Sequence, residues 1–229
     1  MGIRKAYPKE LVEPYDERHF GGRSGQYIFR KDCQTLESLL EPPPGLTLDI
    51  PCGTGAYVTA FTEKGYDVVA ADASMPMLEA TGRRESGACR VLCDIDHLPF
   101  RDDVFDAGMT IRLFSHYPKD DVVRILHELR RVIRPRGRVV FDTFRWTPRQ
   151  WPLFRRFLEQ SYIYVVSHRD VEEMIRNAGL RKVDARYLYL FSPLWQRKLP
   201  VWVLRALTVL EALLPERWLL RAFWACTKD

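Results

Sequence analysis

The chain has 229 residues, of which 46% are hydrophobic and 28% are charged. That length fits one α/β domain with a sizeable core, so we expect residues 1–229 to form a single domain of ordinary soluble character. The first ten residues contain no apolar run, which argues against a secretory signal. The five cysteines lack paired C-x-x-C spacing, which argues against a zinc site and predicts buried, reduced thiols in a cytoplasmic protein.

The net charge of +5 is unevenly distributed along the chain. Residues 134–229 carry 18 Lys and Arg against 9 Asp and Glu, whereas residues 1–133 carry 17 against 21. A basic half can indicate an acidic substrate, a nucleic acid or a membrane surface as partner, or it can be an arginine-rich solvated surface. Charge alone leaves these alternatives open.

The predicted elements begin with a polar arm at residues 1–25, which ends in the glycine-rich run GGRSG, and a helix from Gln26 to Leu40. Apolar segments then alternate with helical ones, which favours a mostly parallel sheet with helices on both faces. The strands are expected at 46–50, 66–71, 89–93, 104–110 and 137–143, and the helices between them at 56–64, 75–84 and 119–132.

The C-terminal third departs from this alternation. A basic, aromatic stretch at 145–164 predicts an insertion on the substrate side of the domain. Ser167 is then the predicted N-cap of a helix that ends at Gly179, and an alternating strand is expected at 182–191.

The segment from Leu199 to Trp224 is apolar, but charged residues interrupt it, so no run approaches the about 20 residues of a membrane span. We expect a core helix packed on the sheet. Two alternatives remain open: residues 192–218 cap a hydrophobic substrate, or residues 197–221, with their basic side chains, lie on an anionic membrane surface.

The run LDIPCGTG, from Leu48 to Gly55, joins an apolar strand to a helix through a glycine-rich turn, which is typical of a nucleotide-binding loop. Glycine lets the backbone approach a ligand closely because it has no Cβ. The second strand leads into Asp72, and an acidic side chain there can accept hydrogen bonds from both hydroxyls of a ribose. The turn and this acid together predict an adenosine-containing cofactor.

The dinucleotide-binding pattern G-x-G-x-x-G requires a third glycine, but Val58 occupies that position. The pattern D-x-x-x-G-x-G from Asp49, with an acid after the second strand, instead resembles the class I S-adenosylmethionine-dependent methyltransferases. The runs CDIDHLPFRDDVFDAG at 93–108 and HELRRVIRPRGRVVFDTF at 127–144 are similar to later parts of the same family, in its order and spacing.

The resemblance spans about residues 46–144 and implies the fold and the cofactor. The fold would be α/β, with a Rossmann-like, seven-stranded, mostly parallel sheet and helices on both faces. A final strand at 224–228 would return antiparallel beside the sixth. S-adenosylmethionine would bind to the core at 46–144, and residues 1–45 would form an N-terminal arm and helix.

The resemblance also implies which residues hold the cofactor. Gly53 and Gly55 would bring the turn close to the methionine part, and Asp49 would hold either the amides of the turn or the ammonium group. The family usually has glycine where Pro51 stands, and proline removes one amide donor, so we interpret the loop as a variant. The predicted cofactor-binding residues are Tyr27, Asp49, Pro51, Gly53, Gly55, Asp72, Ala73, Met77, Asp94, Ile95 and Arg112.

Some of these assignments have simpler alternatives. Asp72 would bind the ribose, or else cap the following helix. Asp94 and Ile95 would bind the adenine amino group, or else Asp94 is a carboxylate of an acidic loop. Tyr15, Phe20, Tyr27 and Arg30 of the N-terminal region are candidates for a lid.

Two residues after the fourth strand are the candidates for catalysis. Ligands of open α/β sheets bind at the carboxyl ends of strands, which brings Arg112 and His116 near the methyl donor. His116 could be a general base for a hydroxyl acceptor, or a structural histidine. Arg112 could bind an acidic acceptor or pair with a carboxylate of the N-terminal arm. The loop lacks the N/D-P-P-Y/F run of methyltransferases that modify base amino groups.

We therefore predict transfer of a methyl group from S-adenosylmethionine to a small-molecule acceptor by in-line displacement. Aromatic side chains in the expected substrate-side segments favour a bulky, partly hydrophobic acceptor. A tRNA-modifying methyltransferase is one alternative, suggested by the basic C-terminal half. A non-catalytic interaction module that keeps the fold is the other, and the oligomeric state stays open.

Overall fold

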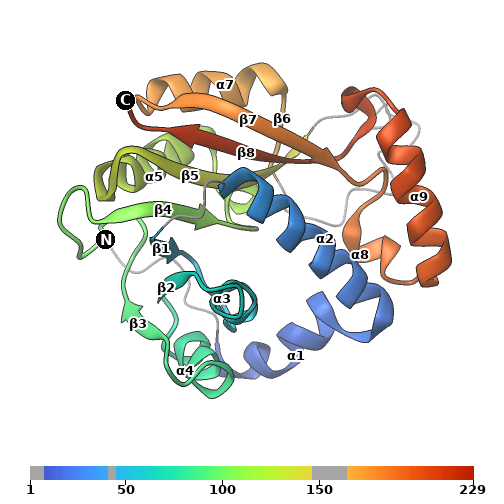
Figure 1. Ribbon diagram of the computed structural model, residues 1–229, viewed down its shortest axis with the longest axis horizontal. Helices are drawn as coiled ribbons and strands as arrows, with labels where there is room; N and C mark the ends of the chain where they lie inside the picture. Colours follow the sequence, from blue (N-terminus) through green and yellow to red (C-terminus); the bar gives the residue numbers. More distant parts are fainter. Residues whose placement is uncertain (1–7, 41–44, 146–163) are drawn as a thin grey trace.

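The computed structural model describes residues 8–40, 45–145 and 164–229, which build one twisted sheet between two layers of helices (Figure 1). The strand order is β3-β2-β1-β4-β5-β8-β7, and β6 pairs with β5 outside this path. Strand β8 runs antiparallel to both β5 and β7, and the other pairs are parallel. The strands are β1 (Leu46–Asp49), β2 (Asp67–Asp72), β3 (Cys89–Leu92), β4 (Phe105–Thr110), β5 (Ile133–Arg145), β6 (Val165–Val166), β7 (Arg181–Leu188) and β8 (Arg221–Thr227).

The predicted class of fold is confirmed, but the number of strands is wrong, because the described residues contain eight rather than seven. The additional strand, β6, consists of two residues beside Phe144 and Arg145 of β5. Two residues are too few for an alternating pattern to be recognised in a sequence. The last strand begins at Arg221, three residues before its predicted start, and lies between β5 and β7.

Helices cover both faces of the sheet, as the alternation of elements predicts. The helices α2, α3 and α4 lie on one face, and α5 and α7 lie on the other. The helices of the described residues are α1 (Lys9–Phe20), α2 (Gly22–Leu40), α3 (Ala56–Thr62), α4 (Met75–Arg84), α5 (Lys119–Val132), α7 (His168–Asn177), α8 (Pro193–Gln196) and α9 (Val201–Leu213), with short 3-10 turns η1 (Phe114–His116) and η3 (Glu216–Trp218).

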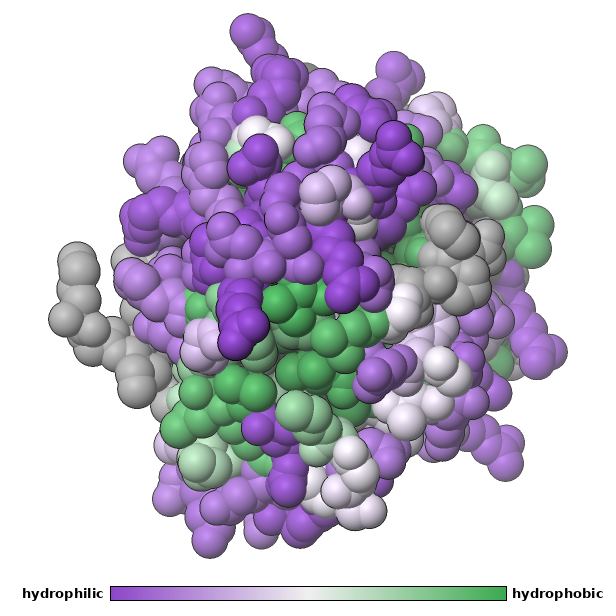
Figure 2. All heavy atoms as spheres, turned by 60° about the vertical axis from the view of Figure 1, so that its left-hand side comes forward, coloured by the Kyte–Doolittle hydropathy of each residue, from purple (hydrophilic) through white to green (hydrophobic). Residues whose placement is uncertain are grey.

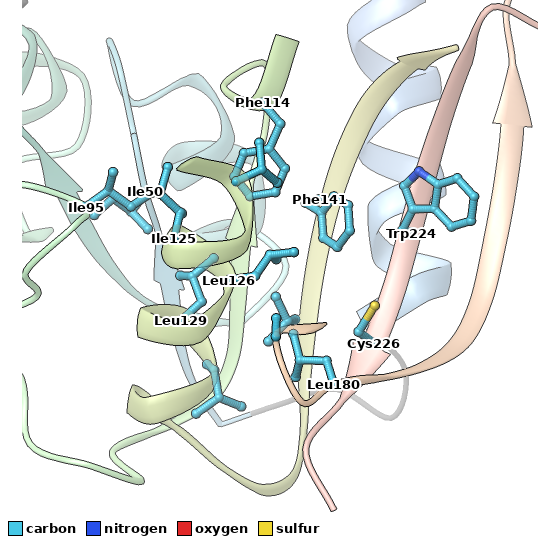
Figure 3. Close-up of a cluster of buried hydrophobic side chains, with 14 of the residues drawn as sticks. Ile50, Ile95, Phe114, Ile125, Leu126, Leu129, Phe141, Leu180, Trp224 and Cys226 are labelled. Atoms are coloured by element: carbon cyan, nitrogen blue, oxygen red, sulfur yellow. The ribbon is translucent and has the colours of Figure 1, made fainter. Parts of the chain in front are cut away.

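The period of two in the central strands divides the core into two clusters. In β5, Val139 and Phe141 pack under α5 and α7, whereas Val140 packs under α2 and α3. Figure 3 shows the first cluster, in which Leu126 and Leu129 of α5 face Phe141 and the C-terminal strand. Both sheet faces are therefore buried, which leaves the carboxyl ends of the strands to carry the site.

Local signals set the ends of α7. The Ser167 hydroxyl accepts a hydrogen bond from the Asp170 amide at 3.1 Å, and the Asp170 carboxylate accepts one from the Ser167 amide at 3.0 Å. This reciprocal pair is a capping box, and Gly179 follows the helix with φ of +69°. Both predicted ends of this helix are confirmed.

The N-terminal region differs from its prediction. Instead of a polar arm up to residue 25, the chain forms α1 and then starts α2 at Gly22, which has φ of +67°. A Pro14 in α1 and the glycine-rich run obscure this helical pair in the sequence. The α1 residue Asp16 accepts a hydrogen bond from Thr54 in the glycine-rich turn and pairs with Arg84 of α4, so α1 lies over the turn.

The prediction of a core helix packed on the sheet near the C-terminal end is also wrong. The helix α9 packs against α2 rather than on the sheet, through Leu204, which contacts Ile28 and Tyr189. Its buried Glu211 pairs with Lys31 of α2 and accepts the Leu190 amide at 2.8 Å. The hydrophobic pattern did not predict this arrangement, because apolar residues lie around most of the helix and a carboxylate lies on its buried side.

The surface is mostly hydrophilic in the view of Figure 2, where hydrophobic side chains gather in a patch near the centre and again at the upper right edge. None of the helices in the described ranges is both long and apolar enough to cross a membrane. The predicted buried thiols are confirmed for Cys33, Cys52 and Cys226, whereas Cys89 is exposed and Cys93 is half-buried at the sheet edge. Most of the predicted insertion at 145–164 lies outside the described residues.

Candidate functional site

The glycine-rich turn between β1 and α3 lies at the carboxyl end of the central strands. Gly53 and Gly55 both have positive φ, +55° and +80°. A Cβ on Gly55 would lie 2.8 Å from the Thr81 methyl group of α4, whereas a Cβ on Gly53 would meet no atom within 4 Å. Gly55 is therefore needed for packing of the turn, and Gly53 faces open space from which a ligand can approach the backbone.

Asp72, at the end of β2, holds this turn in place. Its carboxylate accepts the Gly53 amide and the Ser74 amide, each at 2.9 Å. Burial raises the pKa of Asp72, and hydrogen bonds from the amides of Ser74, Gly53 and Ala73 oppose that rise. A carboxylate has about four acceptor positions, so the three amides leave about one position free, and the second hydroxyl of a ribose would share an oxygen with an amide.

Asp49, at the end of β1, lies beside Asp72 with its carboxylate 1% exposed. Neither of its carboxylate oxygens has a hydrogen-bond partner in the described structure. Burial, and then the charge of Asp72, raise the pKa of Asp49 well above its ordinary value. Because Asp72 rather than Asp49 accepts the Gly53 amide, Asp49 is left as an acceptor that lacks a donor or a cation.

The end of β3 adds a second pair of residues to this edge. Strand β3 pairs with β2, and the Cys93 amide donates to the Asp72 carbonyl at 3.0 Å. The Asp94 carboxylate accepts the Asp96 amide at 3.1 Å, which is the loop interaction considered as its alternative role. Ile95 is buried, and so is Met77, the third residue of α4. Asp94 and Ile95 therefore follow the strand that pairs with β2 on the side away from β1.

Two of the predicted cofactor-binding residues have surroundings that differ from those of Asp49 and Asp72. Pro51 is half-buried in the turn and follows a cis peptide bond. Tyr27 of α2 directs its hydroxyl to Thr208 of α9 at 3.1 Å, so the structure does not bring its hydroxyl together with Asp49 and Asp72.

Arg112 follows β4 with φ of +61°, a conformation that costs a non-glycine residue about 1–2 kcal/mol. Its amide donates to a carboxylate oxygen of Asp142 in β5 at 2.6 Å, and the other Asp142 oxygen accepts from Arg221 of β8 at 2.6 Å. Arg221 also pairs with Asp32 of α2 at 2.8 Å. This buried network fixes the backbone of Arg112, and it draws on three separate parts of the chain.

The Arg112 guanidinium lies 4.5 Å from the Phe20 ring centre of α1 and 5.8 Å from that of Tyr57 in α3. Its hydrogen-bond partner in the described structure is the Tyr57 hydroxyl, at 3.4 Å. The rings of Phe20, Phe29 and Tyr57 pack together with centres 4.8 to 6.3 Å apart. An aromatic wall from three helices thus adjoins a cation at the end of β4.

The two histidines near this edge differ in their surroundings. His116 is exposed at the end of η1, and partial desolvation lowers its pKa. His19 of α1 is half-buried, with its Nδ1 2.8 Å from the Tyr15 carbonyl. Burial and the neighbouring cations, Arg112 foremost, lower the pKa of His19 to about 4. His19 is therefore neutral at physiological pH, and its hydrogen bond at Nδ1 leaves Nε2 as the acceptor.

Sequence reasoning missed His19, Thr81 and Asp142. His19 lies in a segment interpreted as an arm, and only the helical spacing of Tyr15 and His19 could have placed both on one face. Thr81 and Asp142 act through tertiary contacts with Gly53 and Arg112, which no local pattern reports.

Comparison with known proteins finds relatives for the part of the chain that contains the glycine-rich turn and the sheet edge. Residues 48–141 match the family described as a methyltransferase domain. Over 115 residues the chain is 43% identical to a demethylmenaquinone methyltransferase from Thermobifida fusca, covering 48% of each chain. Over 104 residues it is 36% identical to a probable tRNA methyltransferase 9B from Homo sapiens, covering 44% of this chain and 22% of that one. The chain thus spans about half the length, or less, of these curated relatives.

The likeness in structure extends further along the chain. A SAM-dependent methyltransferase from Thermotoga maritima, described as a possible histamine N-methyltransferase, superposes with a TM-score of 0.69 at 19% identity. That match covers 96% of this chain and 97% of the other. At this identity the superposition establishes the fold, which includes the N-terminal and C-terminal segments outside residues 48–141.

Proposed function

We propose that this chain, whose residues 48–141 match the methyltransferase domain family, binds S-adenosylmethionine and transfers its methyl group to a small-molecule acceptor. The observation that carries the proposal is the buried Asp49 carboxylate, whose two oxygens lack partners beside the glycine-rich turn. A ligand with an ammonium group, a ribose and little bulk near Gly53 fits the donors and acceptors of this edge.

Each residue of the edge has a separate task in this proposal. Asp49 would neutralise the ammonium of the cofactor, Asp72 would accept the ribose hydroxyls, and Asp94 and Ile95 would lie at the adenine. Gly53 would admit the methionine part, because its missing Cβ leaves open space. Tyr27 has no assigned part, since its hydroxyl bonds to α9.

When bound, S-adenosylmethionine supplies an electrophilic methyl group on a sulfonium, which needs no metal ion. The protein's contribution is to orient the acceptor, exclude water and, for a hydroxyl acceptor, accept its proton. The aromatic wall of Phe20, Phe29 and Tyr57 can orient a flat, apolar acceptor and keep water away. The candidate proton acceptors are His116, which the sequence indicates, and His19, which the structure adds.

The acceptor is proposed to be bulky and partly hydrophobic. The aromatic wall supports this, and so does the demethylmenaquinone methyltransferase among the relatives, whose named acceptor is of that kind. The human relative named as a probable tRNA methyltransferase favours tRNA as the second candidate acceptor, together with the basic C-terminal half. Binding of tRNA that falls steeply with salt would support the second candidate, and indifference to tRNA at low salt would remove it.

Calorimetric titration tests the cofactor directly. We expect S-adenosylmethionine and S-adenosylhomocysteine to bind the wild type at micromolar strength, and NADH not to bind. Asp72→Ala should lose most of the affinity, and Asp72→Asn, which keeps an acceptor oxygen, should lose less. Tight binding of NADH alone would point to a dehydrogenase, and binding of neither sulfur compound would refute the proposal.

A second surface supports contact with a membrane. The side chains of Trp202 and Leu213 in α9 are 73% and 78% exposed, and Val209, Leu210 and Trp195 are exposed nearby. Arg205 and Arg217 lie on the same segment, so the apolar side chains have cations beside them. We propose that this segment lies on an anionic bilayer, from which a hydrophobic acceptor could be taken.

Sedimentation with vesicles tests the membrane proposal. At low salt the protein should co-sediment with vesicles that contain phosphatidylserine and less with neutral ones. Trp202→Ala together with Leu213→Ala should weaken this binding. The buried neighbour Leu204 is not substituted, because it belongs to the contact with α2. Failure of the wild type to co-sediment would refute membrane contact without affecting the proposed chemistry.

A further inference from the structure

In the described part of the chain, the side chain of Arg112 has no counter-ion. Among the described residues, no carboxylate forms an ion pair with its guanidinium, although the group is half-buried. The two buried acids nearby are engaged elsewhere. Asp142 uses one oxygen for the Arg112 amide and the other for Arg221, and Asp32 binds Arg221 and Tyr189. The expected carboxylate partner from the N-terminal arm is therefore absent from the described contacts.

Two aromatic rings compensate this cation only in part. The guanidinium approaches Phe20 to 4.5 Å and Tyr57 to 5.8 Å, and cation–π contacts are weaker than a charge-assisted hydrogen bond to an anion. A guanidinium has five N–H donors, and the Tyr57 hydroxyl takes one of them at 3.4 Å. Most of the donors of Arg112 thus have no hydrogen-bond partner among the described residues.

Further charges of the same sign gather at this place. His19 is surrounded by Arg112, Arg197 and Arg18, which together with burial lower its pKa. Arg197 of the segment after α8 donates to the Glu17 carbonyl at 2.6 Å, and its Nε has no partner in the described structure. Cations from α1, the loop after β4 and the segment after α8 therefore converge on His19.

The backbone at Arg112 is held in this position at a cost. Its φ of +61° is unfavourable for arginine, and the buried pair of Asp142 and Arg221 stabilises it by accepting its amide at 2.6 Å. Arg136 also has positive φ, +65°, but it is exposed, and its amide donates to the Lys228 carbonyl. A buried polar network thus fixes the Arg112 backbone, from which the side chain projects.

We propose that the methyl acceptor is an anion, and that the Arg112 guanidinium binds its carboxylate or phosphate group next to the aromatic wall of Phe20 and Tyr57. This inference rests on the proposed function and specifies its substrate class. The acceptor is then amphiphilic, with an apolar body against the rings and an acidic group on Arg112. The neutral imidazole of His19 lies beside the bound anion.

Matched probes test this inference by binding rather than turnover. 1-Naphthoate, 1-naphthyl phosphate and the uncharged 1-naphthamide share one apolar body and differ in charge. In protein saturated with S-adenosylhomocysteine, at least one anionic probe should bind about tenfold or more tightly than the amide. Which of the two anions binds more tightly distinguishes a carboxylate from a phosphate.

Variants connect the charge preference to Arg112. Arg112→Gln should abolish the preference for the anionic probes, and Arg112→Lys should keep part of it. Because Arg112 is also a predicted cofactor-binding residue, the S-adenosylhomocysteine affinity of each variant is measured first, and the probes are compared only in saturated protein. The matched control is Arg136→Gln, which removes an exposed arginine of the same backbone conformation and should keep the full preference. Should Arg112→Gln not fold, nuclear magnetic resonance of the wild type gives an independent answer. An anionic probe should raise the pKa of His19 from about 4, and the amide should not.

The outcomes separate the two levels of the proposal. Absence of S-adenosylhomocysteine binding refutes the proposed function. Binding of S-adenosylhomocysteine with equal affinity for all three probes, with no affinity for any of them, or with a preference that Arg112→Gln retains, refutes the anionic acceptor alone.

Discussion

Replacing Asp49 by asparagine should stabilise the ligand-free protein and weaken cofactor binding at the same time. The Asp49 carboxylate is buried, and both of its oxygens lack partners. An asparagine amide would also lack partners there, but an unsatisfied buried group costs more when it is charged than when it is neutral. We take the extra cost of the charge, which the substitution removes, as about 1–3 kcal/mol. For a domain of this size that gain corresponds to a rise in Tm of about 2–12 °C.

The gain in stability should depend on pH in a defined direction. Burial raises the pKa of Asp49 in the folded state, so its favourable contribution is present below the ordinary carboxyl pKa of about 3.9. That contribution is lost as pH rises through the raised pKa. The difference in Tm between Asp49→Asn and wild type should therefore grow as pH rises from about 3.9 through the raised pKa of Asp49.

The effect on the cofactor should be opposite in sign. A ligand present at about 100 times its Kd stabilises the wild type by about 2.7 kcal/mol, which is a shift of about 5–11 °C. Loss of a charge-assisted contact of about 1.5–3 kcal/mol should reduce the shift caused by S-adenosylhomocysteine to about half or less.

Thermal unfolding with and without S-adenosylhomocysteine measures both effects in one experiment. The matched control is Asp67→Asn, which removes an exposed acid from the opposite end of β2 and should change neither quantity appreciably. A ligand-free Asp49→Asn protein that is less stable than wild type, or one that keeps the full ligand-induced shift, would refute the reasoning.

Three further predictions concern the turn, a helix end and the buried network. Gly53→Ala should lower stability by about 1 kcal/mol and abolish cofactor binding. Gly65→Ala, with φ of +85° and equally open surroundings, should lower stability by the same amount and bind the cofactor normally. Equal binding by the two variants would contradict the role of Gly53. Ser167→Ala should cost about 1 kcal/mol in chemical denaturation through loss of the capping box, with unchanged cofactor affinity. Arg221→Met should cost about 3–5 kcal/mol because it leaves two buried carboxylates unpaired, and a near-neutral result would show that the network is not a determinant of stability.

The sequence predicted the elements whose signals are local. Residues 46–144 yield strands and helices close to the observed bounds, because apolar alternation and glycine-rich turns act within a few residues. The antiparallel return of the last strand beside the sixth followed from the family resemblance, since no local rule specifies it. The capped helix after Ser167 was predicted at both ends for the same local reason.

The errors arose where tertiary contacts decide. The helix α1 is stabilised by its contacts with α2 and α4 and by the tie from Asp16 to Thr54, none of which a sequence pattern contains. Apolar residues of α9 lie on its exposed sides as well, so its pattern did not reveal that the inward side carries Leu204, Leu207, Thr208 and Glu211. Two-residue β6 is too short to carry a pattern of any kind.

The residues of the candidate site could be predicted from the sequence, but the contacts between their side chains could not. Asp49, Gly53 and Asp72 were singled out from motif and spacing, and the structure brings them together at one edge. That Asp72 rather than Asp49 holds the turn is a matter of side-chain geometry. The unpaired charge of Arg112 likewise depends on Asp142 and Asp32 being bound by Arg221.

Transfer of an isotopically labelled methyl group is the most direct test of the central proposal. The purified protein would be incubated with S-adenosylmethionine labelled in its methyl group and a fractionated metabolite extract, and the products followed by mass spectrometry. We predict that S-adenosylhomocysteine accumulates and that the label appears in an acidic, partly apolar small molecule. A protein that binds the cofactor but forms no S-adenosylhomocysteine with any fraction would contradict the proposed activity.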